Sequence, residues 1–170
     1  MMRRTSTRIQ KLVSPVTILP LIAIILAAGS QHPTSLFAQG GARISGAGIS
    51  KVGRDTRKLT ATAQAQAGSN AANGTIQFIH NSPAGLSRFR GTITCLSVSG
   101  GTVQISGSIE KGETATGGLL DGKAFSITIN ASGNPQSFSL PNVGDAGTIA
   151  PCSGGRGETV PVTEDGFKLQ

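Results

Sequence analysis

The fold of this 170-residue chain is limited most by a series of short stretches in which apolar and polar residues alternate. Residues 103–109 (VQISGSI) and 125–129 (FSITI) alternate without a break, and residues 75–79 (TIQFI) follow the same rule. Because successive side chains of a β-strand point to opposite faces, each stretch predicts a strand with one buried apolar face and one face of Ser, Thr or Gln in water. After residue 39 we find no convincing helical periodicity.

Other stretches predict further strands with less regular patterns. Residues 92–98 carry Ile93 and Cys95 on one face and Leu96 and Val98 on the other. This indicates either a central strand covered on both sides or a β-bulge that changes the register. Residues 59–66 alternate small with polar types, which favours a strand facing a tight core over a helix across residues 61–72. Additional strands are predicted at residues 42–50, 136–140 and 166–169.

Turn residues separate these stretches. Asn73-Gly74, Gly117-Gly118 and residues 142–145 all tolerate positive φ, and Ser99-Gly100-Gly101 is the strongest hairpin signal. Evenly spaced short strands with such turns between them are typical of closed or layered β architectures. The sequence therefore predicts an all-β fold: an antiparallel sandwich or a small barrel of about seven or eight short strands.

The N-terminal residues have the layout of a secretory signal peptide. Basic residues are followed by an apolar run at residues 19–28 and then by small residues. The run is shorter than the about 20 apolar residues that a bilayer-spanning helix needs, although residues 12–29 together could form an uncleaved anchor. We expect residues 1–38 to be a signal peptide and residues 39–170 to form a single all-β domain; cleavage after Gly29 is equally compatible. The basic residues concerned are Arg3, Arg4, Arg8 and Lys11.

Removal of residues 1–38 changes the charge argument. It leaves 11 basic and 8 acidic residues, so the net charge falls from +7 to +3. The remaining basic residues are spread out, and aromatic residues on which bases could stack are few, so we expect no nucleic-acid partner. One basic cluster remains, and we interpret it as a solvated turn between strands because it includes Asp55. The cluster consists of Lys51, Arg54, Arg57 and Lys58.

The two cysteines, Cys95 and Cys152, predict one disulfide, because paired cysteines in a secreted chain are normally oxidised. Closing so long a loop stabilises the fold by about 4 kcal/mol in the chain-entropy estimate. Two cysteines without nearby histidines cannot complete a tetrahedral zinc site. A catalytic thiol is a poorer interpretation still, since His80 is the only histidine after residue 38 and a free thiol would be oxidised outside the cell.

In three neighbouring runs, the order of apolar, polar and glycine residues resembles that of a known family. They are residues 73–80 (NGTIQFIH), 89–100 (FRGTITCLSVSG) and 103–109. The pattern resembles the post-COAP domain, a small secreted all-β bacterial domain of unknown function, over roughly residues 42–138. That resemblance implies a fold and an extracellular location but no activity. Family members carry an acidic turn before a Phe-Ser strand; here residues 130–139 (NASGNPQSFS) contain no carboxylate, so we expect no cation site there.

We find no catalytic constellation, metal-ligand set or cofactor motif. The run at residues 117–123 (GGLLDGK) has the glycines and lysine of a phosphate loop, but Ala124 follows where a Ser or Thr must bind Mg²⁺. His80 precedes a turn and is expected to be a surface or hydrogen-bonded histidine. Two carboxylate pairs, Glu110 with Glu113 and Glu164 with Asp165, lie in predicted turns and loops and are expected to be solvated.

These observations leave three classes of function. The first is a non-enzymatic secreted, periplasmic or envelope-associated module that is structural or binds a partner, either a protein or a cell surface. The second is a carrier that holds an apolar small molecule in a barrel cavity. The third is a hydrolase, which needs convergent acid, base or metal groups that the sequence does not supply. After cleavage of the signal peptide we expect no stable membrane span.

Overall fold

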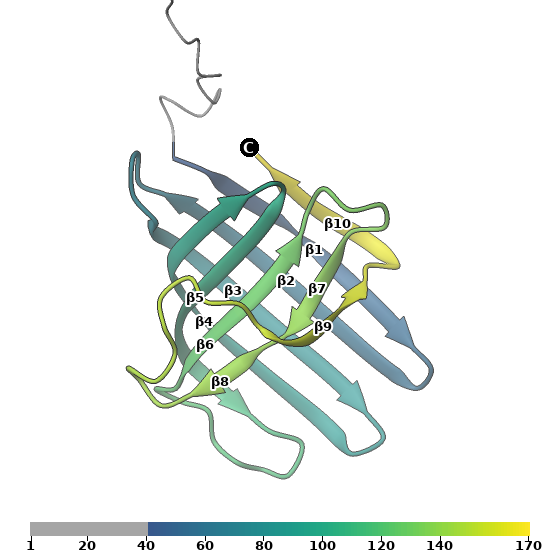
Figure 1. Cartoon of the computed structure of the whole chain (residues 1–170). Coiled ribbons are helices and arrows are strands. Elements are labelled where there is room, and N and C mark those ends of the chain that lie inside the picture. The colour runs from purple at the N-terminus through teal and green to yellow at the C-terminus, as the bar shows by residue number, and fades with distance from the viewer. Residues whose placement is uncertain (1–40) are drawn as a thin grey trace, which may run out of the picture. The chain divides into compact units, whose positions relative to one another are not determined.

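A computed structural model describes residues 41–170 of the chain, and all of its regular elements in this range are strands (Figure 1). The predicted signal peptide, residues 1–38, lies outside the described residues, so its cleavage and the domain boundary at residue 39 stay predictions. The strands are β1 (Arg43–Val52), β2 (Asp55–Ala65), β3 (Ala71–Ser82), β4 (Gly85–Ser99), β5 (Thr102–Glu113), β6 (Ala124–Asn130), β7 (Ser137–Leu140), β8 (Asn142–Gly144), β9 (Arg156–Pro161) and β10 (Glu164–Leu169).

All ten strands belong to one antiparallel sheet that curls on itself (Figure 1). Its order is β10-β1-β2-β3-β4-β5-β6-β7-β9, and β8 pairs with β6. The predicted all-β antiparallel fold with one disulfide is confirmed, in the form of a single curled sheet rather than two layers. Two strands were not expected: β8 lies where a turn was predicted, and β9 has the sequence RGETVP, which lacks apolar alternation.

The alternation seen in the sequence places one apolar face of each long strand inside the curl. Leu59, Ala61 and Ala63 of β2 are buried, and so are Ile76 and Phe78 of β3. Small side chains are needed on β2 because β3 approaches it closely. A Cβ atom built on Gly74 of β3 would lie 2.6 Å from the Cβ atom of Ala63. The strand predicted at residues 59–66 is therefore confirmed, and the helical alternative is wrong.

A β-bulge interrupts β4, as one of the two interpretations of residues 92–98 predicted. The register against β5 shifts between Ile93 and Cys95, so Thr94 has no partner on β5. Ile93 and Leu96 both belong to the core inside the curl. Because the extra residue reverses the alternation between them, Cys95 points to the outer face, where it meets Cys152.

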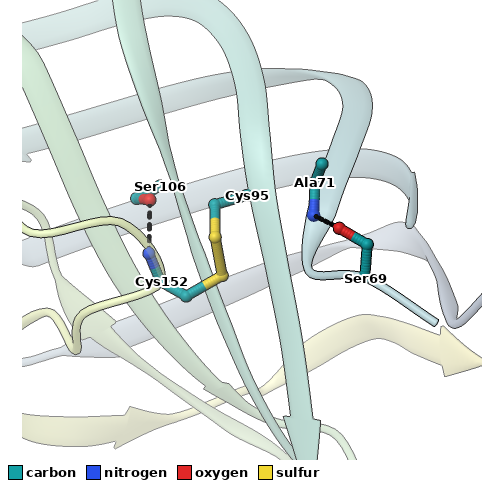
Figure 2. The surroundings of a disulfide bond; sticks show 5 residues. All are labelled: Ser69, Ala71, Cys95, Ser106 and Cys152. Atoms are coloured by element: carbon teal, nitrogen blue, oxygen red, sulfur yellow. Dashed lines mark hydrogen bonds between the residues drawn. A yellow bond between two sulfur atoms is a disulfide. The ribbon is translucent and has the colours of Figure 1, made fainter. Parts of the chain in front are cut away.

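A strap formed by residues 145–155 links β8 to β9 and crosses the outer face of β4, β5 and β6 (Figure 1). The disulfide Cys95–Cys152 fixes it, and the backbone N–H of Cys152 donates a hydrogen bond of 2.8 Å to Oγ of Ser106 (Figure 2). The Oγ of Ser126 donates to the carbonyl of Gly154 at 2.7 Å. The expectation that these outer hydroxyls face water is wrong for Ser106 and Ser126, because the strap buries both.

A side chain instead of a strand ladder joins β10 to the segment just before β7 at the other end of the sheet. The amide of Gln136, just before β7, hydrogen-bonds both backbone groups of Phe167 in β10. The link between β9 and β10 is held as well, since Val162 N donates to Gln136 O and Thr163 N donates to Ile49 O, each at 2.7 Å. These bonds close the curl around the core.

Candidate binding edge

Three connections, β1–β2, β3–β4 and β5–β6, lie along the same edge of the curled sheet (Figure 1). One large hydrophobic side chain is exposed in or directly beside each connection: Val52 is 50% exposed, Leu86 is 42% exposed and Leu119 is 75% exposed. Within residues 41–170 these are the large hydrophobic side chains that are exposed. We call this set of three side chains the apolar edge.

Turn chemistry explains why these side chains are outside the core. Val52 is followed by Gly53 at φ +62°, and a Cβ atom there would meet no other atom within 4 Å. Leu119 lies in a loop with Gly117 at φ +82° and Gly122 at φ +77°, and both positions are equally open. Val52 belongs to the last pair of the β1–β2 ladder, opposite Asp55, and Leu86 lies one pair from the end of the β3–β4 ladder, opposite Asn81. Their side chains therefore lie at the margin of the sheet, away from the core.

Most carboxylates in this part of the sheet are matched with cations. For example, Arg88 Nη2 lies 2.8 Å from Glu113 Oε1, and Lys111 Nζ lies 3.1 Å from Asp121 Oδ2. The full set of pairs is Asp55 with Arg57, Glu113 with Arg88, Asp121 with Lys111, Asp145 with Lys123 and Glu164 with Lys51. Against the described side chains, Arg54, Lys58 and Arg90 form no ion pair, and neither do the carboxylates of Glu110 and Asp165. The unpaired charges in this part of the sheet are thus three positive and two negative.

A surface groove adjoins the edge on the outer face of β3, β4 and β5. Its volume is about 420 Å³, and Leu119 stands at its border. Arg90 lies opposite Gln77 of β3 and opposite Lys111 of β5 in the ladder registers, so two cations and an amide share this part of the groove. The groove is lined by Gln77, Arg88, Phe89, Arg90, Lys111, Gly112, Glu113, Leu119 and Asp121.

Asp121 fastens the β5–β6 loop to the sheet. Its Oδ1 accepts a hydrogen bond of 2.9 Å from the backbone N–H of Gly112, and its Oδ2 pairs with Lys111. The hydrogen bond from Gly112, and after it the ammonium group of Lys111, lower the pKa of the Asp121 carboxyl. The carboxylate therefore stays charged at neutral pH and holds both Lys111 and the loop that carries Leu119.

The predicted basic cluster is divided by the structure. Lys51, Arg54 and Lys58 are exposed, as expected for a solvated turn. Arg57, in contrast, shows 15% of its side chain, and its Nη2 lies 3.3 Å from Asp55 Oδ2. Its Nε atom and the Oγ of the fully buried Ser50, which faces it in the β1–β2 register, have no hydrogen-bond partner among the described residues.

The other residues considered in the sequence lie apart from one another. His80 Nε2 is 3.3 Å from Asp55 Oδ2, Glu110 accepts a hydrogen bond from Thr92, and Glu164 pairs with Lys51. Residues 117–123 form part of a strand-to-strand connection with no helix in it. Among residues 41–170, no three His, Cys, Asp or Glu side chains gather as metal ligands would.

The interior of the curl is filled. Ile44, Leu59, Ile105, Ile127 and Ile129 are 0% exposed, whereas a cavity large enough for a ligand would leave accessible area on the side chains around it. A second surface hollow of about 710 Å³ lies at the end opposite the apolar edge, bordered by Ala42, Ala65, Leu96, Val98 and Leu169 among others. No helix in residues 41–170 is long and apolar enough to cross a membrane.

Sequence reasoning did not identify the apolar edge. The available signal was an apolar residue directly beside a turn glycine, as in Val52-Gly53, Gly85-Leu86 and Gly118-Leu119. It indicates a shared surface only if all three turns lie at the same edge of the sheet, and this can be judged only when the strand order is known.

Comparisons of the chain with family models, with curated proteins and with solved structures find no match. The resemblance to the post-COAP domain therefore stays a prediction that rests on the strand pattern.

Proposed function

We propose that this protein is a secreted or envelope-associated, non-enzymatic module that binds a partner on the cell surface through its apolar edge. The observation that carries the proposal is the position of Val52, Leu86 and Leu119, which are exposed together along one edge of the sheet. Hydrophobic side chains scattered singly over a surface are ordinary, whereas a group of them beside unbalanced charge is typical of an interaction site.

Two further observations support a binding module over the alternatives. The filled interior offers an apolar ligand no space, which counts against a carrier. The carboxylates of Glu110, Glu113, Asp121 and Glu164 are engaged in separate ion pairs and hydrogen bonds, which counts against a hydrolase with convergent acid and base groups. The disulfide is compatible with an extracellular or periplasmic location.

The proposal is tested by binding of the purified, disulfide-bonded protein to envelope preparations from a bacterial host. A triple variant, Val52→Ser with Leu86→Ser and Leu119→Ser, should lose most of the binding because it removes the apolar area of the edge. Gln66→Ser, at an exposed position in the β2–β3 connection at the other end of the sheet, is the matched control. Equal binding by the wild type and by a folded triple variant, as judged by circular dichroism, would show that the edge is not the binding site.

A further inference from the structure

We propose that the partner of the apolar edge is a lipid bilayer whose surface carries anionic phospholipid headgroups. This inference rests on the proposed function and names the partner class of the same site. In this arrangement Val52, Leu86 and Leu119 enter the interface between headgroups and acyl chains, while the adjoining groove receives a headgroup phosphate.

The spacing of the three side chains suits a broad, nearly planar partner. Val52 ends β1 and Leu86 is the second residue of β4, so they are three strands apart, roughly 14 Å along the sheet. Leu119 follows β5, one strand further on. Three anchors set along an edge in this way do not form a single pocket that one compact side chain or small molecule could fill. They can all enter a bilayer interface at the same time.

The unpaired charges near the edge favour an anionic surface. Five carboxylates there are each paired with a cation, which leaves three unpaired cations, Arg54 near Val52, Lys58 on β2 and Arg90 in the groove. Two unpaired carboxylates, Glu110 and Asp165, lie further from the strand ends than Arg54, so the group closest to the apolar side chains is positive. Anionic lipids attract basic residues near the surface, and salt weakens this attraction. The exposed cations therefore add to the apolar contacts when the leaflet is negative.

The groove has the donors that a phosphate group needs. Arg90 and Lys111 supply cationic N–H groups and Gln77 supplies an amide, all on neighbouring strands at the same level of the outer face. Asp121 orients Lys111 through the 3.1 Å ion pair and balances its charge, as Glu113 balances Arg88, so Arg90 is the unpaired cation among the groove residues. Leu119 borders both the groove and the edge, which places a headgroup beside an inserted side chain.

Vesicle sedimentation tests the inference directly. The full chain, expressed in a secreting host and recovered under non-reducing conditions, is mixed with vesicles of phosphatidylcholine alone or of phosphatidylcholine with phosphatidylglycerol. We expect binding to the mixed vesicles that weakens as salt rises, and little binding to phosphatidylcholine alone. The triple edge variant should bind on the order of 100-fold more weakly, and Arg90→Gln about fivefold more weakly.

The controls separate edge effects from general ones. Gln66→Ser and Lys168→Gln change exposed residues away from the groove and should bind as the wild type does. The inference is overturned by equal binding to neutral and anionic vesicles, by no binding to either, or by a folded triple edge variant that still binds fully. If envelope binding depends on the edge while vesicles are not bound, the lipid inference fails and the proposed function stands.

Discussion

The side-chain amide of Gln136 takes the place of a neighbouring strand beside Phe167: Nε2 donates to the carbonyl of Phe167 at 2.8 Å, and Oε1 accepts from its N–H at 2.6 Å. A β-strand next to β10 would make the same two bonds. The residue thereby blocks the centre of an open strand edge, a place where sheets are prone to pair with other chains.

Replacing Gln136 with Ala should destabilise the protein by about 2 kcal/mol, because it leaves two backbone groups of the buried Phe167 unpaired. This corresponds to a melting temperature lower by roughly 5–10 °C. Thermal unfolding followed by circular dichroism measures it. Gln64→Ala, at an exposed position of β2, is the control and should change the melting temperature little. If the two variants melt alike, the side-chain bridge has no role in closing the sheet.

Removing the disulfide by the double change Cys95→Ala with Cys152→Ala should lower stability by up to about 4 kcal/mol, because the bond closes a loop between residues 57 positions apart. Hydrogen exchange should rise first in the strap, residues 145–155, since its remaining links are hydrogen bonds to side chains of the sheet and the ion pair of Asp145 with Lys123. An unchanged melting temperature and unchanged exchange in the strap would contradict this account.

Ser126→Ala should cost about 1–2 kcal/mol, although serine-to-alanine changes on the outer face of a sheet are normally harmless. The hydroxyl is fully buried beneath the strap, and its loss leaves the carbonyl of Gly154 without its donor. Ser108→Ala, on the exposed outer face of β5, is the matched control. Chemical denaturation of both variants tests whether the strap buries Ser126 in solution.

Asp121→Asn should reduce stability at neutral pH and make no difference in strong acid. The pKa of Asp121 is lowered below its ordinary value of 3.8, so the unfolded chain takes up a proton at higher pH than the folded one. The stabilisation is complete above 3.8 and is lost as the pH falls through the lower folded value. Melting temperatures of both proteins across this range should converge on acidification, and a constant gap would refute the role given to the carboxylate.

Much of the sheet is predictable from the sequence because alternation reports directly on which face of a strand is buried. The core residues of β5 and β6 follow from local pattern, and the bulge in β4 is one of the two interpretations that the pattern allows. The strands β8 and β9 do not, since β8 is three residues long and β9 contains Gly157 and Pro161. They form because the free edges of β6 and β7 supply backbone hydrogen-bond partners for β8 and β9, and those edges exist only in the assembled sheet.

The candidate site was less predictable than the fold. Val52, Leu86 and Leu119 are far apart in sequence and share an edge because every second connection of the antiparallel sheet returns to it. The burial of Ser106 and Ser126 likewise depends on a strap whose path is set by a long-range disulfide. Periodicity within one segment carries no information about either.

The pairing of β1 with β10 sets the order in which the protein can be completed. From β1 to β6, each strand pairs with the next in the chain, so hairpins can form as soon as their two strands are present. The opposite side of β1, at residues such as Ile44 and Gly46, gains its partner when Leu169 and Phe167 arrive. A ribosome that has not yet released β10 therefore holds an incomplete sheet, and we expect pulse-labelled hydrogen exchange to show the β1–β10 amides protected last.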